Sequence, residues 1–175
     1  MEQTINQIIY WSRYTSKIGR FYLAATINGL CFMGSPNKGI EELENWANKR
    51  FPTYELVQDD KRLEPYKQEL EEYFIGERRT FSMPVDVEGT PFQMKIWAAL
   101  KEIPYGETIT YSQIANMINK PSAVRAVGTA IGRNPLLVSV PCHRVVGKDG
   151  SLTGYRGGLE MKKSLLQLEQ KQGRH

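Results

Sequence analysis

The sequence has 175 residues, of which 41% are hydrophobic and 24% are charged, so it can bury a core and is not typical of a disordered chain. Residues 1–88 contain 11 Lys/Arg and 14 Asp/Glu, a net charge of −3, whereas residues 89–175 contain 12 and 5, a net charge of +7. A polyanion is therefore expected to bind the C-terminal half, although ordinary solvated lysines explain the same charges equally well.

Composition also argues against several classes of protein. No run of about 18 apolar residues exists, so we expect no membrane-spanning helix. The first residues lack the basic and then apolar pattern of a signal peptide, and Cys31 and Cys142 do not make a disulfide framework. We therefore expect a reduced, cytoplasmic protein. Two Cys and two His without a CxxC or HxxxH pair also argue against a structural zinc site.

The first half, residues 1–88, is predicted to be a small α/β domain. Two strands within residues 19–34 are expected to meet at Asn28-Gly29, the dipeptide of a tight hairpin turn. Apolar residues at helical spacing predict helices within 39–51 and 62–76, and Gly76 is a suitable stop for the second. Residues 81–87 are interpreted as a last strand, at a sheet edge because of Pro84.

The second half, residues 89–175, is predicted to be a mainly helical domain. Thr90 can cap a helix that Pro91 opens, and Thr110 with Gln113 forms a capping box before the helix of residues 111–119. Ser122 is expected to cap the next helix, over residues 123–132. Two short helices separated by about three residues indicate a helix-turn-helix. An amphipathic helix over residues 157–170 is expected to close the chain.

The second helix of this motif has two different faces when it is read at about 100° per residue. The predicted core face consists of Val124, Val127, Gly128 and Ile131. The predicted exposed face is small and basic, and consists of Arg125, Ala126, Thr129, Ala130 and Arg133. Small side chains let a helix approach a partner closely and arginines suit phosphates, so we favour nucleic-acid binding. The alternative is an alanine-rich surface chosen only for helix propensity.

Cys142 lies in the crowded segment "SVPCHRVVG" and is directly followed by His143. A nearby imidazole can help a thiol to ionise, and His143 is the plausible base for a nucleophilic Cys142. Residue types alone leave open whether Cys142 reacts or is a buried core thiol, as most lone cysteines are. Cys31, between Leu30 and Phe32 in a predicted strand, fits the core interpretation.

The segment "NPLLVSVPCHRVVGKDGSLTGYRGGLEMKKSLLQLE" resembles the active-site region of the O6-alkylguanine-DNA alkyltransferases, also called methylated-DNA–protein-cysteine methyltransferases. The Asn-Pro, Pro-Cys-His-Arg-Val and Gly-Tyr-Arg-Gly-Gly-Leu motifs follow in the family's order and spacing. The segments "PFQMKIWAALKEIPYGETITYSQIA" and "AVRAVGTAIGRNP" extend the resemblance upstream, so that it covers about residues 90–169. The N-terminal half resembles the family only in general layout.

The resemblance implies roles for individual residues. Cys142 matches the alkyl-accepting cysteine, and His143 and Glu169 match its relay, with a water molecule between His143 and the thiol. Cys142 should therefore ionise more readily than a free cysteine. Asn134 matches the residue that braces the active-site turn, and Tyr111 the residue that helps to turn the damaged nucleotide out of the duplex.

Further matches concern the base pocket and DNA. Val145, Tyr155 and Arg156 match positions that line the guanine pocket, and Arg125 matches the arginine that fills the vacated place in the base stack. In this family the helix-turn-helix enters the minor groove, which suits the small side chains of Ala126 and Thr129. Some members bind zinc in the N-terminal half, but the ligands are absent from this sequence, so no metal is expected. No cofactor is expected either.

The sequence therefore predicts an α+β protein with an N-terminal α/β domain holding a small, mostly antiparallel sheet, and a C-terminal helical domain with a helix-turn-helix. The expected function is repair of O6-alkylguanine, with O4-methylthymine as a further substrate, by a monomer that binds duplex DNA and transfers the alkyl group irreversibly to Cys142. Two alternatives remain. A helix-turn-helix regulator would bind a specific DNA sequence without chemistry, and a cysteine hydrolase would turn over an ester or amide and ignore DNA.

Overall fold

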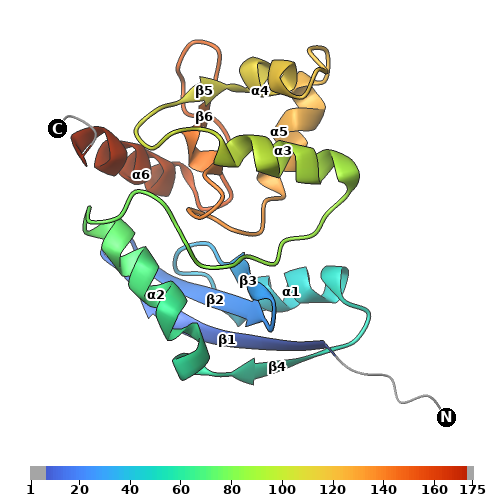
Figure 1. Cartoon of the computed structure of the whole chain (residues 1–175), viewed down its shortest axis with the longest axis vertical. Coiled ribbons are helices and arrows are strands. Elements are labelled where there is room, and N and C mark those ends of the chain that lie inside the picture. The colour runs from blue at the N-terminus through green and yellow to red at the C-terminus, as the bar shows by residue number, and fades with distance from the viewer. Residues whose placement is uncertain (1–6, 173–175) are drawn as a thin grey trace.

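A computed structural model describes residues 7–172 of the chain (Figure 1). The outermost residues of both predicted domains, 1–6 and 173–175, lie outside the described residues. Below, residues 7–88 are called the N-terminal region and residues 89–172 the C-terminal region. The N-terminal region holds a small sheet with two helices, and the C-terminal region is mainly helical, as predicted for an α+β protein. Within the described residues, no helix combines the length and apolar character needed to cross a membrane.

The sheet of the N-terminal region has four strands in the order β3-β2-β1-β4. They are β1 (Gln7–Thr15), β2 (Arg20–Thr26), β3 (Gly29–Met33) and β4 (Tyr54–Gln58). β2 pairs antiparallel with β1 and with β3, while β4 pairs parallel with β1. The predicted hairpin and the mostly antiparallel sheet are therefore confirmed. β1 and β4 were not predicted, because β4 has five residues and neither strand alternates cleanly between buried and exposed positions.

The hairpin turn lies one residue earlier than predicted. Thr26 pairs with Gly29, so Ile27 and Asn28 form the turn. Gly29 has a positive φ of 151°, and a Cβ atom there would lie 2.6 Å from the carbonyl oxygen of Pro84. Glycine is therefore needed at the start of β3 because another segment of the backbone passes close to it.

The predicted strand over residues 81–87 is wrong. This segment makes a single parallel bridge, between Val85 and Leu30. The Leu30 amide donates to the Pro84 carbonyl at 3.0 Å, and the Asp86 amide donates to the Leu30 carbonyl at 2.7 Å. The segment therefore crosses the edge of β3 and leads the chain into the C-terminal region.

Two helices cover opposite faces of the sheet: α1 (Ile40–Arg50) and α2 (Asp60–Phe74). Both match the predicted helices, and Gly76 follows α2 with a φ of 83°. Successive residues of a strand point to opposite faces. Accordingly, Ala24 packs with Leu43 of α1, whereas Leu23 belongs to the cluster that contains Leu70 of α2.

The C-terminal region contains α3 (Pro91–Lys101), α4 (Tyr111–Met117), α5 (Val124–Gly132) and α6 (Leu159–Gln172). Thr90 with Gln93 and Thr110 with Gln113 form complete capping boxes at the starts of α3 and α4. These two predicted helix starts are confirmed.

The predicted cap of α5 is wrong. The residue at the N-cap is Ala123, and no side chain caps the helix. The Ala123 amide donates to the Lys120 carbonyl at 2.9 Å, which closes a turn around Pro121 and Ser122. Ser122 therefore lies inside this turn and not at the helix start.

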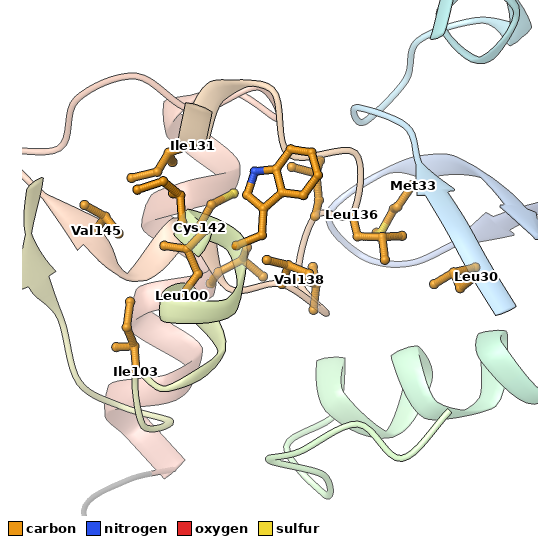
Figure 2. Packing of buried hydrophobic residues seen from close by; sticks show 14 of the residues in the cluster. Leu30, Met33, Leu100, Ile103, Ile131, Leu136, Val138, Cys142 and Val145 are labelled. Atoms are coloured by element: carbon orange, nitrogen blue, oxygen red, sulfur yellow. The ribbon is translucent and has the colours of Figure 1, made fainter. Parts of the chain in front are cut away.

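One hydrophobic cluster runs through both regions. It joins residues of β2, β3 and α2 with residues of α3, α4, α5 and α6. Figure 2 shows Leu30 and Met33 of β3 on one side of Leu136 and Val138, and Cys142 among Leu100, Ile131 and Val145 on the other. The turn that precedes Cys142 therefore lies where the C-terminal region packs against the N-terminal region.

Candidate active site

The turn between α5 and Cys142 is organised by the side chain of Asn134, which is 1% exposed. The Asn134 amide nitrogen donates to the carbonyls of Leu136 at 2.9 Å and Val140 at 3.0 Å, and its oxygen accepts from the Leu136 amide at 2.9 Å. Within this turn Val138 has a φ of 69°, a left-handed conformation that is unfavourable for a β-branched residue. The Asn134 side chain therefore holds together a strained turn that leads to the cysteine.

Cys142 is the first residue of a short 3₁₀ helix, Cys142–Arg144, and is 4% exposed. Burial raises the pKa of the Cys142 thiol, while the Asn134 side chain and the positive charges of Arg156 and Lys162 oppose this shift. The expectation that Cys142 ionises more readily than a free cysteine is therefore wrong for the protein without substrate. Desolvation of the thiolate outweighs the groups that would stabilise it.

His143 and Glu169 form a buried pair. His143 Nε2 lies 2.6 Å from Glu169 Oε2, and the two side chains are 0% and 1% exposed. Burial lowers the pKa of His143 even though Glu169 opposes the shift, so the imidazole is neutral near pH 7 and can accept a proton. Among the described residues, Nδ1 of His143 has no hydrogen-bonding partner.

Glu169 is held as an anion by several donors. Burial alone would raise its pKa, but hydrogen bonds and charges from His143 and Arg144 outweigh burial and lower the pKa to about 2. Arg144 Nε donates to Oε1 at 2.8 Å and Nη2 to Oε2 at 3.0 Å, and the Gly106 amide donates to Oε1 at 3.2 Å. The hydroxyl of Tyr73 donates to Oε2 at 2.6 Å.

Sequence reasoning missed both Arg144 and Tyr73 as partners of Glu169. The adjacency of Arg144 to Cys142 and His143 was a signal that could have pointed to it. Tyr73 lies 96 residues before Glu169, so no local pattern could have indicated the contact.

Tyr111 and the loop of residues 147–158 meet beside this centre. β5 (Ile109–Thr110) pairs parallel with β6 (Val145–Val146), which places Tyr111, the first residue of α4, close to the segment after the cysteine. The Tyr111 hydroxyl donates to the Thr153 carbonyl at 3.3 Å, and Lys162 Nζ donates to the same carbonyl at 2.7 Å. Lys162, which sequence reasoning also missed, therefore helps to hold this loop.

The two pocket positions of that loop differ in where their side chains lie. The Tyr155 hydroxyl is buried and has no partner among the described residues, and burial raises its pKa well above the usual value. The Arg156 side chain does not bind the Tyr155 hydroxyl. Instead its Nη2 donates to the carbonyls of Met33 at 2.6 Å and Pro135 at 3.0 Å. The guanidinium group of Arg156 therefore links the loop to β3 and to the turn before Cys142. Val145, the third predicted pocket residue, is 0% exposed in β6.

Four of the five predicted DNA-binding side chains lie on α5 or at its end, while Tyr111 begins α4. Arg125, Ala126 and Thr129 are exposed on the helix, and Arg133 is exposed at its C-terminal end. A shallow hollow of about 640 Å³ lies over this face and extends to Thr90 and Phe92 at the start of α3.

Ala130 was wrongly assigned to this exposed face. It is 3% exposed, and its carbonyl accepts a hydrogen bond from Trp97 Nε1 at 2.9 Å. The packing of α3 against α5 therefore narrows the exposed face.

Within residues 7–172, no group of three or more His, Cys, Asp or Glu side chains is arranged to hold a metal ion. Cys31, the other free cysteine, is 1% exposed in β3 and packs against residues of α1. Burial, and next to it the charge of Asp86, raises the pKa of the Cys31 thiol. Among residues 7–172, nothing comparable to the pair of His143 and Glu169 lies beside it.

Comparisons with known proteins point to the same family over nearly the whole chain. The family model described as "6-O-methylguanine DNA methyltransferase, DNA binding domain" matches residues 91–171, and the one described as "6-O-methylguanine DNA methyltransferase, ribonuclease-like domain" matches residues 9–87. An inducible methylated-DNA–protein-cysteine methyltransferase of Bacillus subtilis is 59% identical over 97% of this chain and 94% of its own length.

Solved structures are similar as well. The crystal structure of O6-methylguanine methyltransferase from Mycobacterium tuberculosis has a TM-score of 0.80 and 37% identity, over 94% of both chains. A structure described as Mycobacterium tuberculosis OGT in complex with DNA has a TM-score of 0.80 and 36% identity, also over 94% of both chains.

Proposed function

The chain belongs to the 6-O-methylguanine DNA methyltransferase family, and we propose that it repairs O6-alkylguanine in duplex DNA by irreversible transfer of the alkyl group to Sγ of Cys142. The observation that carries this proposal is the position of Cys142, directly before His143 of the buried His143–Glu169 pair and in the hydrophobic cluster against which Tyr155 packs. Within the part of the chain that the structure describes, Cys31 has no such surroundings.

DNA binding is assigned to α4 and α5. The exposed residues Arg125, Ala126 and Thr129 form a face small enough to enter the minor groove, and Arg133 is available to a phosphate. Cys142 is buried, so the damaged nucleotide has to leave the base stack to reach it. Tyr111 supports the turned-out nucleotide, and Arg125 fills the gap left in the duplex.

The chemistry begins with removal of the thiol proton. Neutral His143 takes this proton through a bridging water at Nδ1, while the Glu169 carboxylate stabilises the imidazolium that forms. Because burial raises the pKa of the Cys142 thiol, the thiol is protonated before the substrate binds and needs a base when the reaction begins. The thiolate then attacks the alkyl carbon, the carbon–oxygen bond breaks, and the electron pair leaves with the guanine oxygen.

Departure of the base, with the electron pair on its oxygen, is helped by hydrogen bonding. Hydrogen bonds from the Tyr111 hydroxyl and from backbone amides near Arg156 to the leaving guanine ease its exit. The product is a thioether, which offers no carbonyl carbon to water, so the protein reacts once. O4-methylthymine carries its methyl group on a comparable exocyclic oxygen and is proposed as a second substrate. The protein is proposed to act as a monomer in the cytoplasm.

The test is the intact mass of the protein after incubation with excess O6-methylguanine duplex. We expect one addition of about 14 Da, as for methyl transfer to a nucleophilic side chain. Peptide mapping should place it on Cys142. Cys142→Ala should gain no mass yet still bind the duplex, and Cys31→Ala should react like the wild type. Repeated turnover without a covalent product would contradict the proposal, as would methylation of Cys31.

A further inference from the structure

The carboxylate of Glu169 receives a hydrogen bond from each region of the molecule. Its Oε2 atom lies 2.6 Å from His143 Nε2 and accepts from Arg144 Nη2 at 3.0 Å, both in the C-terminal region. The same oxygen accepts from the Tyr73 hydroxyl at 2.6 Å, and Tyr73 belongs to α2 of the N-terminal region. Tyr73 is 0% exposed.

We propose that Tyr73 is a positioning residue for alkyl transfer, through which the N-terminal region orients the Glu169 carboxylate toward His143. The inference rests on the proposed function, since it assigns a part in that reaction to a residue outside the C-terminal region. Tyr73 touches neither the thiol nor the base, and it acts through Glu169.

The arrangement of donors explains why the hydroxyl matters. Oε1 accepts from Arg144 Nε and from the Gly106 amide, while Oε2 accepts from Arg144 Nη2 and from Tyr73. Without Tyr73, Oε2 would keep Arg144 Nη2 and His143 Nε2 as its partners, both from the 3₁₀ helix, and would have no donor from the N-terminal region. With Tyr73, donors from α2, the segment after α3 and the 3₁₀ helix set the plane of the carboxylate.

The Tyr73 hydroxyl remains a donor throughout the working pH range. Burial, and next to it the charge of Glu169, raises the Tyr73 pKa well above its usual value. Its ring is enclosed by Phe74, Phe81 and Tyr105, with centroid distances of 5.5, 5.6 and 6.2 Å. These contacts do not need the hydroxyl, so Tyr73→Phe should keep the packing and lose only the hydrogen bond.

Loss of this hydrogen bond should also change the titration of His143. The charged and titratable groups around the pair are Arg144 beside His143, Lys162 on α6, Tyr105 after α3 and Tyr155 of the loop. None of them changes in Tyr73→Phe. The negative charge on Oε2 is then shared with one donor fewer, so protonated His143 is favoured and its pKa rises. Because protonated His143 cannot accept the thiol proton, the low-pH limb of the rate profile should move to higher pH.

The experiment compares Tyr73→Phe with Tyr14→Phe. Tyr14 of the same region also donates to a glutamate, the exposed Glu71, but it does not touch Glu169. Transfer from free O6-benzylguanine is measured by intact mass from pH 5 to 9, duplex affinity is measured with Cys142→Ala added to each variant, and His143 is titrated by NMR.

We expect Tyr73→Phe to react about tenfold more slowly, a part of the roughly 10²–10⁴-fold that a positioned acid–base group contributes. Its low-pH limb and its His143 titration should move upward by about half a unit to one unit. Duplex affinity should be unchanged, and Tyr14→Phe should match the wild type. In a Glu169→Gln background, Tyr73→Phe should have no further effect on the rate.

The outcomes separate this inference from the proposed function. If the wild type transfers no alkyl group, the proposed function fails. If the wild type reacts and Tyr73→Phe has the same rate and profile, only the role of Tyr73 is overturned. Equal losses in Tyr73→Phe and Tyr14→Phe, or loss of the folded state in Tyr73→Phe, would assign Tyr73 to the fold and also overturn it.

Discussion

Residues 1–88 carry a net charge of −3 and residues 89–175 one of +7. Cys142, His143 and Glu169 all belong to the positive half, as does the exposed face of α5. The negative half nevertheless reaches this centre: Tyr73 binds Glu169, and the Met33 carbonyl, Ser35 and Glu42 contact Arg156. The division by charge therefore describes where DNA is expected to bind, whereas the acceptor site is built from both regions.

The two cysteines allow a second comparison, because one lies in each region. Both Cys31 and Cys142 are buried, and burial raises the pKa of both thiols. Burial and pKa therefore do not separate the core thiol from the thiol that is proposed to react. The difference is a neutral, buried imidazole held by Glu169 next to Cys142.

The largest predicted effect concerns Glu169, whose carboxylate accepts hydrogen bonds from both regions. In the folded protein the Glu169 pKa is lowered from 4.5 to about 2. A carboxylate with a lowered pKa stabilises the folded state above its unfolded pKa, and this stabilisation is lost as the pH falls from about 4.5 through about 2. For a shift of this size the contribution is about 3 kcal/mol at neutral pH.

Urea unfolding of the wild type and Glu169→Gln from pH 7 to pH 2.5 measures this contribution. The wild type should be more stable at neutral pH, because Glu169→Gln leaves Arg144 buried without its ion partner. The difference in the free energy of unfolding should shrink below about pH 4.5. A difference that stays constant with pH would show that Glu169 is not the linked group.

A smaller effect is expected at Arg125, which lies on the exposed face of α5 that is proposed to bind DNA. Arg125→Ala should slow repair of duplex DNA about tenfold, which corresponds to a barrier increase of about 1.4 kcal/mol. Free O6-benzylguanine needs no extrusion from a base stack, so its reaction should change little. This pattern would differ from that of Tyr73→Phe, which is expected to slow both substrates. Equal losses on both substrates in Arg125→Ala would place Arg125 in the pocket or the fold.

The smallest predicted effect tests whether duplex affinity depends on where the positive charge lies, in the C-terminal half of the chain. Arg133 and Lys61 are both exposed, one at the end of α5 and the other on α2. Arg133→Glu should weaken duplex binding by a few-fold and reduce its salt dependence, because a phosphate contact and its released counterion are lost. Lys61→Glu makes the same change of charge in the N-terminal region and should leave affinity nearly unchanged. Equal weakening in binding titrations at several salt concentrations would show that net charge, not position, sets the affinity.

Much of the fold followed from local patterns. The capping boxes at Thr90 and Thr110 marked the starts of α3 and α4 correctly, because a cap acts on residues only three positions away. Helical spacing likewise predicted α1 and α2. β4 was missed because a five-residue strand is stabilised by its partner β1 rather than by its own pattern.

The sequence by itself determined the order of the motifs, the resemblance carried by the segment around Cys142, and the charge contrast between the halves. Only the tertiary structure decided that Ala130 is buried against Trp97, that Arg156 binds β3, and that Tyr73 reaches Glu169. It also decided that the Cys142 pKa is raised. The physical reason is that burial and hydrogen bonding depend on which groups folding brings together, and residues separated by 96 positions have no local pattern that records their contact.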